Sequence, residues 1–189
     1  MSKNKLTLGG SLNFDHNNTE NEYSNSKNHL WGINPDIGYA VNKNFILGIG
    51  AGFDFFKNKN EYSSSNNVNY ETKSHRFSVF PYLRKYFSIS EKLAFNLEGG
   101  LTFSIRWNEN ARIENSIIDM DKSTTISFSV GITPGITYQL FNKVYLYSNL
   151  GNIGYFKNEN EREDEISKSD SFNFNAFTKN LNFGLFVTL

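Results

Sequence analysis

The chain has 189 residues, which suffices for one compact domain or one closed barrel. It contains no cysteine, so thiol catalysis, thiolate metal sites and disulfides are excluded. Its 19 basic and 19 acidic side chains balance, which argues against a nucleic-acid-binding protein. No apolar stretch approaches the length of a transmembrane helix. A transmembrane β-barrel remains compatible with the mean hydropathy of −0.50, because its apolar residues occupy alternate positions.

The start of the chain, Met1 to Lys5, has no basic region followed by an apolar run, so it is not expected to be a signal peptide. This start fits either a cytoplasmic protein or a mature exported form with a replacement initiator methionine. The rest of the sequence favours the second origin.

Eight β-type runs follow along the chain, and no segment has the apolar period of a helix. Most of them are far longer than the five or six residues usual in soluble domains, and they suit tilted strands that cross a bilayer. The runs are roughly Lys5–His16, His29–Val41, Phe45–Phe56, His75–Phe87, Lys92–Trp107, Thr124–Leu140, Val144–Phe156 and Ser171–Leu189.

Short and long connections alternate strictly between these runs. The short connections are Asn42–Asn44, Ser88–Glu91 and Phe141–Lys143. The long connections are rich in Asn, Ser, Glu and Lys, and we expect them to be polar loops on one side of the barrel, at about 17–28, 57–74, 108–122 and 158–170. The pattern predicts an all-β, eight-stranded, antiparallel, up-and-down transmembrane barrel that forms one domain over residues 1–189.

Alternation within the runs separates a large apolar face from a face of Gly, Ser, Thr and Asn with a few charges. The small polar face cannot form the core of a soluble protein, but it fits the narrow lumen of an eight-stranded barrel. The apolar face must then point outward into lipid, where closure removes both sheet edges. The residues expected to face lipid include Leu8, Leu12, Ile33, Leu47, Ile49, Phe95, Leu101, Val130 and Leu185.

Two local features need special backbone geometry. In run 144–156 the apolar residues occupy one set of alternate positions at the start and the other set at the end. A β-bulge near Asn149–Gly154 would place both sets on the same face. Pro35, Pro81 and Pro134 each precede a short turn by seven residues, and we expect a gap or bulge in the ladder at each of them.

Charged residues fall into two groups by parity and height. We expect a lumen network of paired charges that closes the interior, because buried charges need partners; its members are Asp36, Asp54, Arg84, Glu98 and Arg106. A gated ion path is the alternative for this network. A second group near the outer rim offers contacts to lipopolysaccharide phosphates; it comprises Lys27, Lys57, Lys73 and Lys157.

Catalytic chemistry lacks a local signature. His16, His29 and His75 lie on the outward face, and His16 and His29 can face each other across the first hairpin. None of them has a Ser two residues away on the same face, which an outer-membrane lipid deacylase would need. The acidic run 159–165 lacks the spacing of an EF-hand, although a cation site there stays open. We therefore expect no catalytic residues, no cofactor and no metal.

The eight alternating runs, the tight turns opposite long loops and the ending Phe183–Leu189 resemble the OmpA/OmpX-like superfamily of small outer-membrane β-barrels of Gram-negative bacteria. Leu189 departs from the aromatic residue that usually ends this family's assembly signal. The resemblance implies termini and short turns in the periplasm and long loops outside the cell. Outer-membrane lipid and lipopolysaccharide are then the implied partners, together with a possible protein partner.

These observations predict a non-enzymatic outer-membrane barrel that presents its loops, either as a surface or structural protein or as a subunit of a larger complex. A lipid A-modifying outer-membrane enzyme is the alternative. A soluble barrel of lipocalin type is disfavoured, because its solvent face would be Phe, Leu and Ile.

Overall fold

The computed structural model describes residues 4–21, 24–62, 68–114, 117–162, 165–176 and 182–189. Every described element is a β-strand, and all strand pairs are antiparallel. The described part of the chain contains no helix that is long and apolar enough to cross a membrane. The strands are β1 Lys5–Asn21, β2 Ser24–Asn42, β3 Phe45–Tyr62, β4 Asn69–Ser88, β5 Leu93–Glu114, β6 Ile117–Phe141, β7 Val144–Asn149, β8 Gly151–Arg162, β9 Glu165–Ala176 and β10 Asn182–Thr188.

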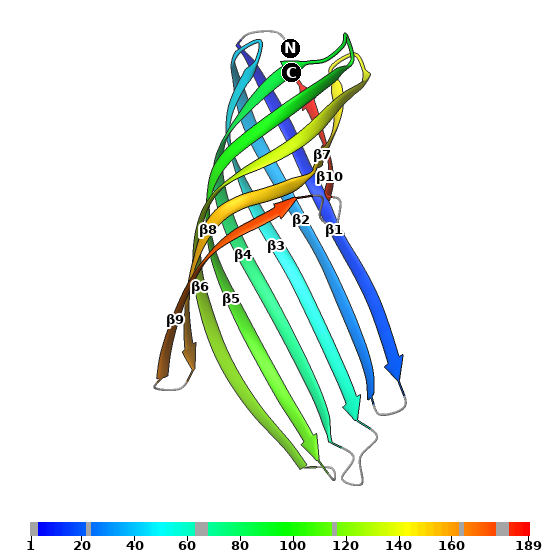
Figure 1. The fold of residues 1–189 in the computed structure, drawn as a ribbon, viewed down its shortest axis with the longest axis vertical. Helices are drawn as coiled ribbons and strands as arrows, with labels where there is room; N and C mark the ends of the chain where they lie inside the picture. The colour runs from blue at the N-terminus through cyan, green and yellow to red at the C-terminus, as the bar shows by residue number, and fades with distance from the viewer. Residues whose placement is uncertain (1–3, 22–23, 63–67, 115–116, 163–164, 177–181) are drawn as a thin grey trace.

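Eight of these strands close into a ring. Strands β1 to β6 pair in chain order, β7 pairs with β6, and β10 joins β7 to β1. Both chain ends lie at the same end of the ring as the three short turns, which we name the turn end (Figure 1). The opposite end, formed by the tips of the long hairpins, is the hairpin end. The expected eight-stranded up-and-down barrel is thereby confirmed.

The ring is continuous only toward the turn end. Strand β10 pairs with β1 over Thr7–Leu12, and β9 pairs with β8 alone. Within the described residues, the outer part of β1 and the free edge of β9 therefore have no strand between them. Figure 1 shows the β8–β9 hairpin standing apart from the β1–β2 hairpin at the lower end. This seam was not expected from the sequence, which predicted a barrel without edges.

The connections agree with the sequence at the turn end and differ from it at the hairpin end. The three short turns lie where they were predicted. The expectation of long polar loops is wrong, since the described parts of 17–28, 57–74, 108–122 and 158–170 are almost entirely strand. Polar side chains pair across these ladders, for example Thr72 Oγ1 with Asn110 Oδ1 at 3.0 Å and Ser74 Oγ with Asn108 Oδ1 at 2.8 Å. Cross-strand pairing of this kind stabilises a ladder without any apolar face.

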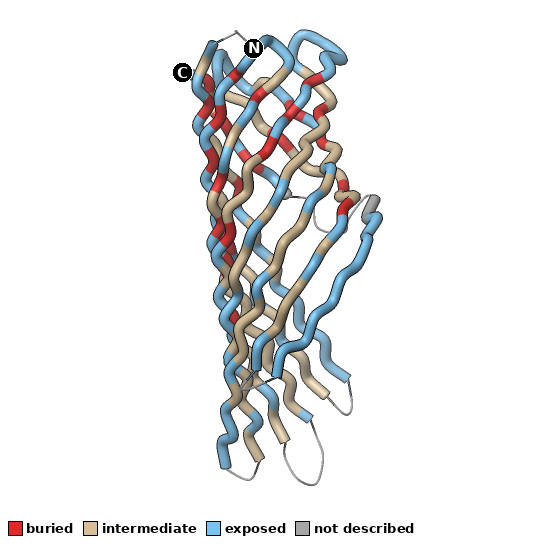
Figure 2. Tube along the Cα trace, turned by 90° about the vertical axis from the view of Figure 1, so that its left-hand side faces the viewer, coloured by how far each residue is buried: buried red, intermediate tan, exposed pale blue. Residues whose placement is uncertain are grey.

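The barrel is apolar on its outside and polar within. On β3, Leu47 is 57 % exposed whereas its neighbour Ile46 is 1 % exposed. Buried residues gather toward the turn end, where the ring is closed (Figure 2). Many of them are polar or charged, which excludes the oily core of a soluble barrel. An exposed Leu, Ile and Phe surface around a polar interior is the arrangement of a protein dissolved in lipid.

The prolines on β2 and β4 interrupt the ladder on one side each, as predicted. Pro35 pairs with Gly10 of β1, but the register of β2 with β3 skips from Ile33 to Asp36. Pro81 behaves in the same way, paired toward β3 and unpaired toward β5. Because proline has no N–H, each gap leaves out a bond that the residue could not donate.

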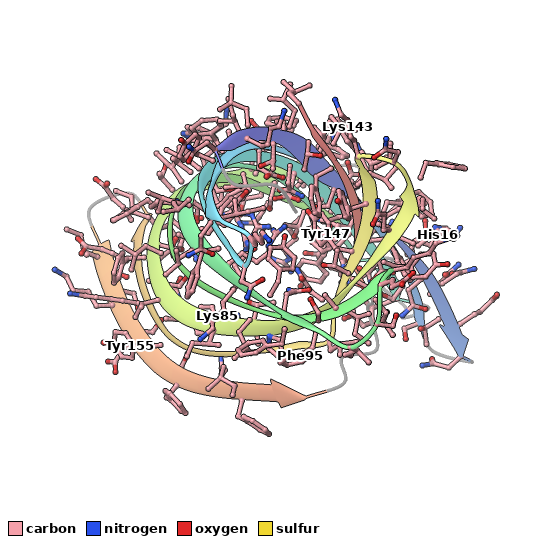
Figure 3. All side chains as sticks on the ribbon, turned by 90° about the horizontal axis from the view of Figure 1, so that it is seen from above. His16, Lys85, Phe95, Lys143, Tyr147 and Tyr155 are labelled. Carbon is pink, nitrogen blue, oxygen red and sulfur yellow. The ribbon has the colours of Figure 1, made fainter. Side chains whose placement is uncertain are left out.

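The bulge predicted in run 144–156 is confirmed at Leu150, between β7 and β8. The register of β6 shifts by one residue between its pairing with β7 and its pairing with β8, and Leu150 N donates to Pro134 O at 2.8 Å. The shift reverses the parity of the strand. Tyr147 consequently points into the lumen and Tyr155 points outward, as Figure 3 shows along the barrel.

Candidate functional site

The lumen at the turn end is filled by a charged and aromatic cluster around Arg84. Arg84 is 4 % exposed and lies directly opposite Glu98 in the register of β4 with β5. Its Nε donates to Glu98 Oε2 at 2.7 Å, and its Nη2 forms an ion pair with the same oxygen at 2.5 Å. The rings of Tyr82 and Tyr147 lie 5.0 and 4.6 Å from the guanidinium carbon. Arg84 is therefore neutralised by one carboxylate and solvated by two π faces.

Asp36 joins this cluster through a tyrosine rather than through Arg84. The Tyr82 hydroxyl donates to Asp36 Oδ1 at 2.6 Å. Gly48 makes room for that ring, because a Cβ there would lie 2.4 Å from Tyr82 Cζ. In the same lumen, the rings of Tyr145 and Phe186 stack at 4.8 Å. The small residues of the predicted lumen face thus accommodate large inward side chains rather than an open bore.

A second ion pair lies farther toward the hairpin end. Arg76 donates to Asp54 Oδ2 through Nε at 2.9 Å and through Nη2 at 2.6 Å, and Asn13 donates to the other oxygen at 3.3 Å. Arg76 was not among the predicted lumen residues, although its parity on β4 is the same as that of Arg84. Its position opposite Asp54 in the register would have identified it.

Arg106 is a correction to the predicted network. It lies opposite Arg76 in the register of β4 with β5, is exposed, and forms no ion pair with any described residue. Parity placed Arg106 on the inner face, but inward side chains are more exposed there than at the turn end, since the side chain of Arg76 is 39 % exposed and that of Arg84 only 5 %. The structure therefore arranges the other four predicted residues in two separate clusters, Arg84–Glu98 with Asp36 nearby and Asp54 with Arg76.

Two small polar cavities lie among the described residues of the lumen. One of about 200 Å³ opens at the turn end beside Lys43, Tyr86 and Lys92. The other, of about 70 Å³, lies beside Glu98, Gly100 and Asn152. Space of this size holds a few waters at each place, and the second cavity lets water reach the partly exposed Glu98.

Three of the predicted rim lysines lie close together on β2, β3 and β4. Lys57 and Lys73 are direct register partners, and both contact Glu71 Oε1, at 3.2 and 2.9 Å. The hydrogen bond from Lys73, together with Lys57, lowers the pKa of Glu71. Lys27 lies opposite Lys59 on the neighbouring ladder. Lys157 is separate from them, on β8 opposite Asp170 of β9.

An aromatic cluster lies next to these lysines on the same strands. Trp31 packs against Phe53 and Phe55 with ring centroids 5.9 and 6.1 Å apart, and His75 lies 5.1 Å from Phe55. Lys57 follows Phe55 by two residues, so the two side chains share the outward face. Along the outward face of β3, the apolar residues are thus followed by the aromatic cluster and then by the lysines. This is the order found where a transmembrane barrel leaves the lipid.

The three histidines have two different environments. His75 packs among Phe53 and Phe55, whereas His16 and His29 face each other with their Nδ1 atoms 3.0 Å apart. In the described part of the chain, no His bonds to a Ser hydroxyl or to a carboxylate. Nor do three or more potential metal ligands of the His, Cys, Asp and Glu types gather anywhere in that part. Among the described residues, the histidines are therefore not paired with a serine nucleophile of the predicted deacylase type.

Comparison with known proteins agrees with this geometry. The family described as an outer membrane protein beta-barrel domain matches residues 2–155. The chain belongs to that family. It is a small outer-membrane β-barrel of the kind found in Gram-negative bacteria, and its location is the bacterial outer membrane.

Solved structures resemble the chain in fold alone. A major outer membrane protein from Thermus thermophilus aligns at 10 % identity over 98 % of both chains, with a TM-score of 0.51. Neisserial surface protein A aligns at 12 % identity over 98 % of this chain and 97 % of its own, with a TM-score of 0.38. Ail, the attachment invasion locus protein of Yersinia pestis, aligns at 11 % identity over 99 % of both chains, also at 0.38. No curated protein matches significantly.

Proposed function

We propose that this barrel is a non-enzymatic surface protein that presents four polar β-hairpins outside the cell, alone or within a larger outer-membrane complex. The observation that carries the proposal is the continuation of the strands past the apolar wall. Strands β1 to β6 extend into long ladders of Asn, Ser, Thr, Lys and Glu. Such ladders hold polar side chains in fixed order, which suits recognition by a macromolecule better than turnover of a small substrate.

The lumen gives the proposal independent support. Several of its inward charges are paired: Arg84 binds Glu98 and Tyr82 binds Asp36 near the turn end, and Arg76 binds Asp54 farther along. A barrel closed in this way is a rigid platform, and its specificity then resides in the hairpins.

Surface labelling tests the presentation directly. A membrane-impermeant amine reagent on intact cells is expected to modify Lys122, whose side chain is 74 % exposed on the β5–β6 hairpin. Lys43, exposed in the β2–β3 turn at the opposite end, is the matched control and should react only after the cells are opened. Reaction of Lys43 but not Lys122 on intact cells would invert the orientation.

Lipid A analysis tests the non-enzymatic part. Mass spectra of lipid A from cells with and without the protein should be identical, because no described histidine has a serine or carboxylate partner. A lost or added acyl chain that reverts in His16→Ala, His29→Ala or His75→Ala cells would favour a lipid A-modifying enzyme instead.

We also propose lipopolysaccharide as the lipid partner of the lysines on β2 to β4. Lys57 and Lys73 share one carboxylate, so two ammonium groups face the headgroup region against a single Glu71. The Trp31, Phe53, Phe55 and His75 rings beside them provide an interfacial anchor. Lipopolysaccharide should raise the melting temperature of the purified barrel less in Lys57→Gln/Lys73→Gln than in wild type. The matched control is Lys143→Gln in the β6–β7 turn, which should respond like wild type; equal responses of all three would refute these contacts.

A further inference from the structure

His16 and His29 form an isolated cross-strand pair near the hairpin end. They are direct register partners on β1 and β2, and both side chains are exposed. Their ring centroids lie 4.5 Å apart, whereas their Nδ1 atoms are only 3.0 Å apart. The two rings therefore converge at their Nδ1 atoms, which lie within hydrogen-bond distance of each other at the protein surface.

The separation of the two nitrogens matches the bite of a metal chelate. With metal–nitrogen bonds of about 2.1 Å, two ligands 3.0 Å apart subtend about 90° at the metal. A tetrahedral site with the same bonds needs about 3.4 Å between its nitrogens. A right angle is the cis angle of square-planar and octahedral ions, which among biological metals favours Cu²⁺ and Ni²⁺.

We infer that His16 and His29 form a bidentate surface site for a divalent transition-metal ion of the Cu²⁺ or Ni²⁺ class. Both Nδ1 atoms donate a lone pair to the ion, and water occupies the remaining positions. Without metal, one ring donates its Nδ1–H to the other. On binding, that proton moves to Nε2 of the same ring, so both imidazoles stay neutral and no net proton is released.

The surroundings allow an ion to approach. Lys57 lies opposite His29 in the register, but its ammonium is engaged by Glu71 at 3.2 Å. Asn18 and Phe14 are the neighbours of His16 on the same face of β1, and neither carries a charge. No acidic side chain is paired with either histidine in the register of β1 with β2 or of β2 with β3. Among the described register partners, the two imidazoles are thus the protein ligands of the site.

Trp31 supplies an optical reporter for the experiment. It lies two residues from His29 on the same face of β2, a spacing of about 7 Å along the strand. Bound Cu²⁺ quenches indole emission at such short range. The purified, folded barrel in detergent is titrated with Cu²⁺ alone, then with Ni²⁺ and Zn²⁺ as competitors. Folding of every variant is checked by its heat-dependent migration in SDS gels.

Wild type and His75→Ala should show saturable quenching, and Trp31→Phe should lose most of it while Trp107 remains. His16→Ala and His29→Ala should lose saturable quenching although they fold. Ni²⁺ should displace Cu²⁺ more effectively than Zn²⁺ does at equal concentration. Unchanged quenching in His16→Ala or His29→Ala, or its loss in His75→Ala, would overturn the site. More effective displacement by Zn²⁺ would overturn the assigned geometry.

Discussion

Removal of the Arg84–Glu98 ion pair should show strong energetic coupling between its two members. Breaking a buried pair costs about 3–5 kcal/mol, because the remaining charge is left without compensation. The Glu98 side chain stays 20 % exposed beside a water-sized cavity, so Arg84→Met should cost about 3 kcal/mol, the lower end of that range. Glu98→Leu leaves a guanidinium side chain that is only 5 % exposed, and it should cost about 4 kcal/mol.

The double variant Arg84→Met/Glu98→Leu replaces both charges by apolar groups of similar volume. Its loss of unfolding free energy should be smaller than the sum of the two single losses by at least about 2 kcal/mol. The assay is reversible urea unfolding of the barrel in lipid vesicles, followed by tryptophan emission. Additive losses would show that the two side chains do not depend on each other. The lumen cluster would then be misassigned.

The same geometry leads to four other expected outcomes. Arg substituted for Leu47 or Leu101 should destabilise the barrel by about 2–4 kcal/mol, whereas Lys57→Arg should change little; equal effects in urea unfolding would refute the lipid-facing assignment. In planar bilayers the wild type should show no steady large conductance steps, because Arg84, Tyr82 and Phe186 fill the lumen; reproducible large steps, unchanged in Arg84→Ala, would show an open bore. Glu71 should titrate by NMR below the 4.5 of a free glutamate, and Lys73→Gln should raise its pKa. Because the pKa of Glu71 is lowered in the folded protein, its ion pairs stabilise the β3–β4 hairpin above pH 4.5. This stabilisation is lost as the pH falls through the folded pKa. A wild-type pKa of Glu71 at or above 4.5 would contradict the ion pairs. Backbone amides of β9 and of the outer part of β1 should exchange with deuterium faster than those of β3, whose ladder is paired on both sides; uniform protection would show that the seam is closed.

The alternation of inward and outward side chains along each strand, which we call parity, accounts for most of what the sequence predicts. The alternation of Leu47 and Ile49 with Gly48 and Gly50 identifies the wall and the lumen, because a strand has a strict period of two. The same period identifies Arg84 and Glu98 as inward residues. Their direct pairing then depends only on the register fixed by the short Ser88–Glu91 connection.

Long-range geometry accounts for the rest. Whether the polar runs form loops or ladders depends on cross-strand pairs such as Thr72 with Asn110, which no local pattern reveals. Arg106 shares the parity of Glu98 but is exposed, and parity carries no information about how far an inward side chain is buried. The seam between β1 and β9 depends on how β8 departs from the ring after Leu150. The sequence shows that bulge, but it does not show where the bulge directs the following hairpin.

The central claim is that this chain is an inside-out barrel whose large apolar face contacts lipid. Its most direct test is a scan of nitroxide labels along β5 from Leu101 to Ser104, placed one at a time through single cysteines, since the chain has no cysteine of its own. In lipid vesicles, labels at the outward Leu101 and Phe103 should collide readily with dissolved oxygen, and labels at the inward Thr102 and Ser104 should be shielded from it. An absent or inverted alternation, with the Leu101 label in contact with a water-soluble relaxation agent, would contradict the account.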